Sequence, residues 1–250
     1  MKSLRRLAKH VAYAAMPQVA ADLDERIWLS RKVRELANRT KKCCAPADYI
    51  AAVRATDAFV PWQNDRELEQ LLEMVQKLRP QRLCEIGSAD GGTLFLFSQL
   101  AADNALIVSM DIKYSPAKLS SFPKFATGGK RVLCIEGDSH HVESKHRLQE
   151  LLAGQPLDFL FIDGDHSYDG VANDFELYSP LVRPGGLIAF HDIVPDNLTT
   201  TGQRSSSYSG EVPRFWKDVK SRFQDCTELV EDWSQDGFGI GVVRWPGALL

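Results

Sequence analysis

The sequence predicts a doubly wound α/β fold, in which helices cover both faces of a mostly parallel β-sheet. From about residue 65 onward, short apolar runs alternate with amphipathic helical stretches, which is typical of parallel strands joined by helices. The apolar runs are continuous, so both faces of the sheet should be buried. The first five runs also end in glycine or charged residues. Ligands in such folds bind outside the carboxyl ends of the strands.

The elements are expected in the following order. An N-terminal helical extension covers 1–62 and the α/β domain covers 63–250. In the extension, "DLDERIWLSRKVRELANR" has apolar residues near helical spacing, and Pro61 ends the helical pattern. Helices of the domain are expected at 65–78, 92–102, 143–154, 171–182 and 212–223. Strands are expected at 82–87, 105–112, 131–137, 157–163, 186–192 and 238–245.

Composition narrows the class of protein. The chain has 250 residues, 44% of them hydrophobic and 25% charged, as in ordinary soluble domains. Its formal net charge of −3 gives no reason to expect a nucleic-acid partner. Five cysteines without C-x-x-C spacing fit the reducing cytoplasm. No apolar run approaches the length of a membrane span, and the oligomeric state is left open, a homo-oligomer included.

The first 16 residues form a separate feature. Leu4, Leu7 and Val11 fall on one face of an expected helix, with basic residues opposite. The apolar run from 11 to 16 is too short for a signal peptide core. Such a helix could rest weakly on an anionic membrane surface or on a partner subunit.

The first predicted strand ends in "CEIGSADGG". Gly87 and Gly91 let the backbone approach a ligand at a helix N-terminus, with Ser88 between them. Ala89 stands where a dinucleotide fingerprint has its middle glycine, and Glu85 lies inside the strand. An acid at this place suits a positively charged ligand better than a pyrophosphate.

The next two strands also end in acids. Asp111 could accept both hydrogens of a ribose diol, and Asp138 with Ser139 could receive an adenine edge. Each of these residues has an alternative interpretation as a helix cap or a solvated turn. Acids at the ends of three consecutive strands favour a shared ligand site.

The fourth strand ends in "FIDGDHSYDG", which places Asp163, Asp165 and His166 together. One interpretation is a cap on the helix beginning near Tyr168. Another is a site for a metal or for a proton in transit, since histidine titrates near neutral pH.

These motifs together resemble a known family. The order E-x-G-x-x-x-G, then Asp111, then Gly137-Asp138-Ser139 resembles a class I S-adenosylmethionine-dependent methyltransferase. The segment "FIDGDHSYDGVANDFELYSPLVRPGGLIAFHDI", followed by "VPRFWKDVK", is similar to the subfamily of macrolide-sugar and rhamnosyl O-methyltransferases and cephalosporin-hydroxylase-like proteins. The resemblance covers about residues 65–245. It implies a seven-stranded Rossmann-like sheet and methyl transfer to a hydroxyl of a sugar or glycosylated small molecule, in natural-product or glycan modification.

The resemblance also implies the roles of site residues. S-adenosylmethionine is expected to contact Glu85, Gly87, Ser88, Gly91, Asp111, Asp138 and Ser139. Asp163, His191 and Asp192 match the positions that hold a divalent cation, usually Mg²⁺. His166 matches the general base, so the expected catalytic residues are His166 and Asp163.

The sequence departs from the family pattern at His191, where related metal-dependent enzymes often carry an acid. Mg²⁺ prefers oxygen ligands. The departure leaves open that Asp165 completes the ligand set, that the ion is Mn²⁺, or that no metal binds.

Three other functions stay open from the sequence. A cephalosporin-hydroxylase-like oxidase would use the same fold for different chemistry. A non-catalytic S-adenosylmethionine-binding protein would have no need for Asp163, His166 and Asp192. A dehydrogenase would prefer a nicotinamide cofactor. The polar segment 196–212, rich in Ser, Thr and Gly, is expected to be a mobile loop that closes over the acceptor.

Overall fold

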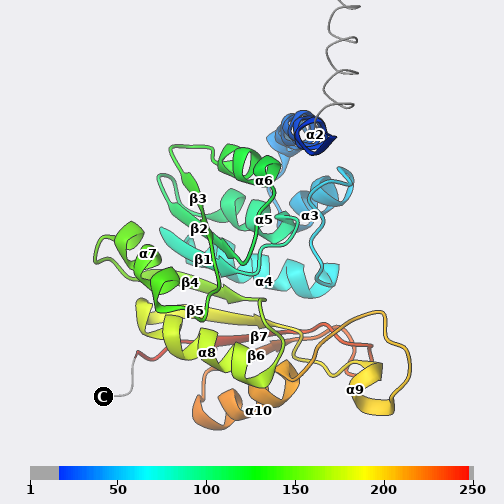
Figure 1. The fold of residues 1–250 in the computed structure, drawn as a ribbon. Helices are drawn as coiled ribbons and strands as arrows, with labels where there is room; N and C mark the ends of the chain where they lie inside the picture. Colours follow the sequence, from blue (N-terminus) through cyan, green and yellow to red (C-terminus); the bar gives the residue numbers. More distant parts are fainter. Residues whose placement is uncertain (1–16, 248–250) are drawn as a thin grey trace, which may run out of the picture.

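The computed structural model describes residues 17–247, which are built around a seven-stranded sheet with strand order β3-β2-β1-β4-β5-β7-β6 (Figure 1). Strands β1 to β5 are parallel, and β7 runs antiparallel to both β5 and β6. This confirms the Rossmann-like, mostly parallel sheet. The strands are β1 (Arg82–Ile86), β2 (Leu106–Asp111), β3 (Arg131–Glu136), β4 (Leu157–Ile162), β5 (Val182–His191), β6 (Cys226–Leu229) and β7 (Ile240–Arg244).

Helices cover both faces of the sheet (Figure 1). One layer contains α2 (Pro17–Arg39), α3 (Pro46–Arg54), α4 (Asp65–Leu78), α5 (Gly92–Leu100) and α6 (Pro116–Ser121). The other contains α7 (Val142–Leu152), α8 (Tyr168–Tyr178) and α10 (Val212–Arg222). The short α9 (Asn197–Thr201) lies in the connection after β5. Single 3₁₀ turns cover Thr40–Lys42, Phe122–Phe125 and Ser179–Leu181.

The two faces of the sheet bury separate cores. In β4, Phe159 and Phe161 belong to the core beneath α4 and α5, while Leu160 and Ile162 belong to the core beneath α8 and α10. Successive side chains of a strand point to opposite faces. A strand covered on both sides therefore needs a continuous apolar run, which explains the pattern seen in the sequence.

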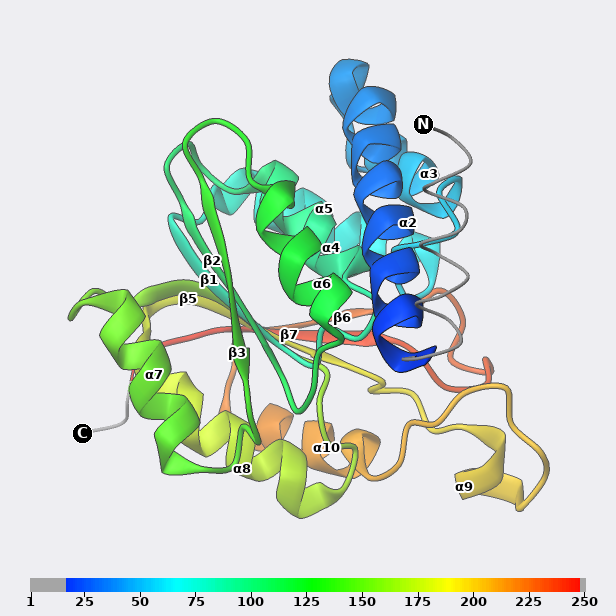
Figure 2. The ribbon, with the colours of Figure 1, turned by 45° about the horizontal axis from the view of Figure 1, so that its top comes forward.

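The N-terminal helices share the first of these cores. Leu29, Val33 and Leu36 of α2 are buried in it together with Phe122, and Figure 2 shows α2 lying beside α6. The Ser115 hydroxyl, at the start of α6, donates to Glu25 Oε1 of α2 at 2.9 Å. The domain boundary near residue 62 stays a prediction. The amphipathic helix expected over 1–16 lies outside the described residues.

Some elements differ from expectation. Strand β6, with the sequence "CTEL", has no apolar run, because it is an edge strand in which only Leu229 is buried. The helix expected over 171–182 ends at Tyr178, a 3₁₀ turn containing Pro180 follows, and Val182 already begins β5. Between residues 17 and 247, none of the helices combines the length and apolar character that a membrane crossing needs.

Candidate functional site

The turns after the central strands stay side by side, because the hydrogen bonds of the parallel sheet continue past the strand ends. The Gly87 amide donates to the Met110 carbonyl at 2.8 Å, and the Asp163 amide donates to the Ile86 carbonyl at 2.9 Å. A cavity of about 770 Å³ opens at this edge of the sheet. Among the predicted site residues, its walls include Gly87, Asp111, Asp138, Ser139, Asp163, His166, His191 and Asp192.

Gly87 allows the first turn to approach the fourth. Its φ of 82° lies in the left-handed region that favours glycine. A Cβ atom at this position would collide with the carbonyl oxygen of Asp163. The glycine therefore brings the predicted cofactor turn into contact with the predicted catalytic turn.

Three predicted cofactor residues lie behind the cavity wall: Glu85, Ser88 and Gly91 are not among its lining residues in the described chain. Glu85 is fully buried, and burial raises the pKa of its carboxyl to about 8, although the hydroxyls of Thr93 and Ser88 partly offset that rise. Within residues 17–247, neither oxygen of Glu85 has a hydrogen bond of good geometry. Their roles in cofactor binding stay predictions.

Asp111 organises the glycine turn. Its Oδ2 accepts from the amides of Ser88 and Ala89 at 3.1 and 3.0 Å, while its Oδ1 accepts from the Lys113 amide at 3.3 Å. The carboxylate thus ties the turn after β1 to the end of β2. It also faces the cavity, where a diol could reach it.

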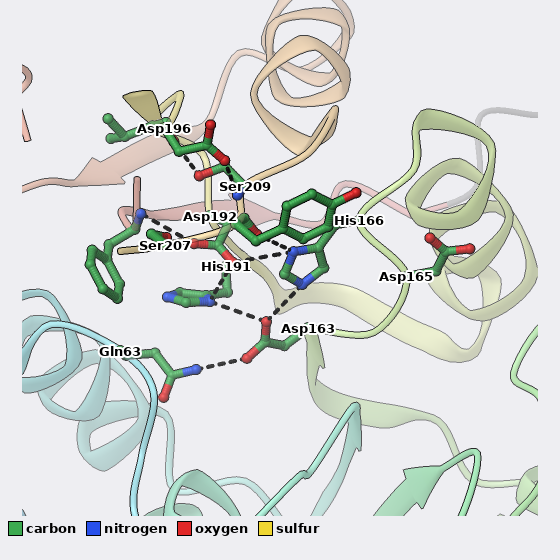
Figure 3. Close-up of polar contacts among 12 residues, drawn as sticks. Gln63, Asp163, Asp165, His166, His191, Asp192, Asp196, Ser207 and Ser209 are labelled. Atoms are coloured by element: carbon green, nitrogen blue, oxygen red, sulfur yellow. Dashed lines mark hydrogen bonds and ion pairs between the residues drawn. The ribbon is translucent and has the colours of Figure 1, made fainter. Parts of the chain in front are cut away.

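Asp163, His191 and Asp192 form the group predicted to hold a metal. Each offers one ligand atom, and these atoms lie within 4.8 Å of one another. His191 Nδ1 is 3.1 Å from Asp163 Oδ1 and 3.1 Å from Asp192 Oδ2 (Figure 3). Asp192 has a φ of 63°, a strained conformation for a residue other than glycine. The Phe238 amide donates to its Oδ1 at 3.2 Å.

The chemistry of this group fits a divalent cation. Carboxylates suit both Mg²⁺ and Mn²⁺, and the imidazole is a better ligand for Mn²⁺ and similar transition-metal ions than for Mg²⁺. The Nε2 atom of His191 is buried and has no hydrogen-bond partner in the described part of the chain. Asp165 points away from the group (Figure 3), and its Oδ1 accepts from the Ser167 amide at 2.8 Å. The structure therefore does not bring Asp165 into the ligand set.

The residue that caps α8 is neither Asp163 nor His166. The Ser167 side chain accepts from the Gly170 amide at 3.0 Å and so caps the helix. Asp163 and His166 make no such contact with α8 among the described residues. A capping role does not account for them.

The buried charges control each other's protonation. Burial opposes the charged form of His191, but Asp163 and Asp192 outweigh it and raise the pKa of His191 to about 10. Burial also opposes ionisation of Asp163, yet His191 and His166 lower the pKa of that carboxyl. The two carboxylates therefore favour the imidazolium form of His191.

His166 has one nitrogen free to act as a base. Its Nδ1 lies 2.6 Å from the Tyr208 carbonyl, and because a carbonyl can only accept, Nδ1 carries the proton. The Nε2 atom is 3.6 Å from Asp163 Oδ1. Burial alone would lower the pKa of His166. Asp163 and Asp192 raise this pKa by more than burial lowers it, so the net effect is an increase.

Gln63 joins the site without any signal in the sequence. Its Nε2 donates to Asp163 Oδ2 at 2.7 Å, and the side chain is almost fully buried (Figure 3). Arg54 of α3 holds this segment by donating to the Pro61 carbonyl at 2.6 Å and the Gln63 carbonyl at 2.8 Å. Trp62, 64% exposed, lines the cavity next to it.

Comparisons with known proteins indicate which proteins this chain is similar to. Residues 84–193 match the family model described as a methyltransferase domain. This segment of the chain is therefore similar to a methyltransferase domain. An uncharacterised protein of Acanthamoeba polyphaga mimivirus is 35% identical over 115 residues, which are 43% of this chain and 49% of that protein. The chain thus spans about half the length of this curated relative.

Solved structures show the same fold. An O-methyltransferase from Bacillus cereus in complex with SAH has a TM-score of 0.55 and 18% identity, over 84% of this chain and 96% of that one. The O-methyltransferase TomG from Streptomyces achromogenes, involved in tomaymycin synthesis and in complex with SAM, has a TM-score of 0.54 and 17% identity, over 81% and 91%. At such identities the likeness shows the fold, that of the class I methyltransferases.

Proposed function

We propose that the chain is an S-adenosylmethionine-dependent O-methyltransferase that acts on a hydroxyl of a sugar or glycosylated small molecule with the help of a divalent cation. One observation carries the proposal: a single cavity joins Gly87, Asp111 and Asp138 to the cluster of Asp163 and His166. The match to a methyltransferase domain supports S-adenosylmethionine as the ligand of the first group.

The residues divide the cavity into two halves. On the cofactor side, Asp111 would accept from the ribose hydroxyls and Asp138 would face the adenine. The turn at Gly87 lets the backbone approach the methionine part of the ligand. On the other side, His166 and Asp192 would face the acceptor.

His166 Nε2 is the atom that would take the acceptor proton. When bound, S-adenosylmethionine would supply its methyl group to the oxygen that His166 deprotonates, and the electron pair of the broken carbon–sulfur bond would stay on sulfur, giving S-adenosylhomocysteine. Asp163 and Asp192 lie 3.6 and 3.5 Å from the ring nitrogens of His166, so both would stabilise the resulting imidazolium.

Asp163, His191 and Asp192 would hold the cation. When bound, a divalent cation lowers the pKa of an acceptor hydroxyl. His191 must lose a proton to serve as a ligand, and its pKa of about 10 means that protons compete with the cation. Metal affinity should therefore rise with pH.

The mouth of the cavity supports a sugar as the acceptor. The rings of Trp62 and Tyr208 line it and are each 64% exposed. Ser205, Ser206 and Ser207 add polar groups. Flat apolar faces combined with hydroxyl groups suit a ring that has both C–H faces and hydroxyl edges.

Metal removal tests the proposal. We would incubate the protein with labelled S-adenosylmethionine and a panel of glycosides, with and without chelator. Chelator should abolish methyl transfer, added Mg²⁺ or Mn²⁺ should restore it, and calorimetry should show nearly unchanged cofactor affinity. Undiminished transfer in chelator would rule out the metal. Transfer to non-glycosylated phenols in place of glycosides would rule out the acceptor class.

A further inference from the structure

The first turn of α4 contains a buried carboxylate that takes no part in the proposed reaction. Glu67 has no exposed surface. Its Oε1 accepts from the Glu231 amide at 3.2 Å and from Gln235 Nε2 at 2.7 Å, and its Oε2 accepts from the Gly239 amide at 2.8 Å. All three donors belong to the β6–β7 turn, residues 230–239. Because a buried carboxylate is tolerated only among donors, Glu67 fixes this turn to α4.

The β6–β7 turn in its turn holds Asp192. The Phe238 amide donates to Asp192 Oδ1 at 3.2 Å, and the Val194 amide donates to the Phe238 carbonyl at 2.9 Å. Asp192 and Phe238 have φ values of 63° and 64°. Such conformations in residues other than glycine persist only where the surroundings fix them. Since Glu67 binds the amide of Gly239, the next residue, α4 braces the peptide that contacts Asp192.

Asp163 is held from the same end of α4. Gln63, four residues before Glu67, donates from its Nε2 to Asp163 Oδ2 at 2.7 Å (Figure 3). This leaves Asp163 Oδ1 facing His191 Nδ1 at 3.1 Å. Asp192 has the same arrangement, since a backbone amide holds its Oδ1 and its Oδ2 faces His191 Nδ1 at 3.1 Å. In each carboxylate, one oxygen is fixed by a neutral donor and the other faces the cluster.

Residues that hold a metal ligand in place contribute to metal affinity even though they do not touch the metal. A carboxylate with one oxygen fixed presents its other oxygen in a single orientation, so less order has to be gained when a cation binds. We propose that Gln63 and Glu67 are positioning residues of the cation site: Gln63 orients Asp163 directly, and Glu67 orients Asp192 through the β6–β7 turn. This inference rests on the proposed function, because it concerns the cation proposed there.

Titration of the full chain with Mn²⁺ alone tests the proposal, with free Mn²⁺ measured by electron paramagnetic resonance. Gln63→Met removes the donor to Asp163 at nearly constant length, and Glu67→Gln replaces one acceptor oxygen by an amino group. Each variant should raise the dissociation constant of Mn²⁺ about 10–100-fold, the usual effect of losing a residue that orients a ligand. Glu73→Gln changes an exposed carboxylate of α4. It is the matched control and should bind Mn²⁺ as the wild-type protein does.

Two further measurements separate positioning from a general loss of structure. Calorimetry with S-adenosylhomocysteine should show unchanged affinity in both variants, because the side-chain hydrogen bonds of Gln63 and Glu67 within residues 17–247 do not reach Asp111 or Asp138. If Glu67→Gln fails to fold, Gln235→Met removes a donor to the same carboxylate from the side of the turn. Gln235→Met should also weaken Mn²⁺ binding.

Each outcome has a distinct meaning. A folded variant with the wild-type dissociation constant for Mn²⁺ would overturn the positioning role of its residue and leave the proposed function standing. A parallel loss of affinity for S-adenosylhomocysteine would show a general loss of structure and overturn the positioning role as well. A wild-type protein that binds S-adenosylhomocysteine but no Mn²⁺ would contradict the proposed cation itself, and the positioning of its ligands with it.

Discussion

At the scale of single residues, Asp163 is the centre of the site. Its Oδ2 accepts from Gln63, and its Oδ1 lies 3.1 Å from His191 and 3.6 Å from His166. A carboxylate with partners on both oxygens is held in one orientation. Asp163 can therefore serve as a ligand to a cation and as a neighbour to the base without moving.

The role of His166 is open to a direct test. His166→Ala should lower turnover about 10²–10⁴-fold, because the acceptor hydroxyl loses its general base. Part of the loss should return as pH rises, since hydroxide can replace the base. Turnover would be measured by methyl transfer across pH, with His146→Ala as the control. An unaltered rate in His166→Ala would show that the proton leaves by another route.

Glu85 should make stability depend on pH. The pKa of its carboxyl is raised by burial from 4.5 to about 8 in the folded chain. Between these values the unfolded state has already lost the proton that the folded state retains, so this residue lowers the free energy of unfolding as pH rises. Glu85→Gln removes the effect. Chemical denaturation should show the variant gaining stability relative to wild type from about pH 4.5 to about pH 8, and a constant difference would contradict the buried neutral acid.

At the scale of elements, the connection from β5 to α10 has more structure than its composition suggests. Two carboxylates anchor this connection through hydrogen bonds. Asp196 accepts from the Thr199 and Ser209 amides, both at 2.7 Å. Asp236, from the turn before β7, accepts from the Asn197 amide and the Ser205 hydroxyl. The anchors hold the segment that brings 205–208 to the cavity. Its closure over an acceptor stays a prediction.

Removing the second anchor should loosen this segment. Asp236→Ala should speed amide hydrogen exchange over 197–207 and raise KM for the acceptor, with little change in cofactor affinity. Asp232→Ala is the matched control, since Asp232 accepts within its own turn from the Ser234 amide. Equal exchange in the two variants would mean that the loop is held by other contacts.

At the scale of the whole molecule, α2 is part of the main core. Leu36 of α2 has no exposed surface, whereas Leu23 on the same helix is 55% exposed. Leu36→Ala should lower the free energy of unfolding by about 2–5 kcal/mol. Leu23→Ala should change it by less than about 0.5 kcal/mol. Urea denaturation measures both. Equal small effects would show that α2 folds apart from the domain.

The sequence by itself determined the α/β class and six of the strands, whereas the set Asp163, His191 and Asp192 came from the resemblance to a known family. The class and the strands follow from local patterns, since a strand buried on both faces must be apolar and a parallel sheet aligns its carboxyl ends at one edge. The same reasoning did not predict edge strand β6, because a strand at the edge of a sheet has no need of an apolar run.

The tertiary structure alone decided which side chains meet. Gln63 reaches Asp163 because Arg54 holds the segment around Pro61. His140 lines the cavity, and α8 places Asp174 Oδ1 3.7 Å from its Nε2 atom. Such contacts join residues far apart along the chain. They depend on how helices pack against the sheet, which no short stretch of sequence encodes.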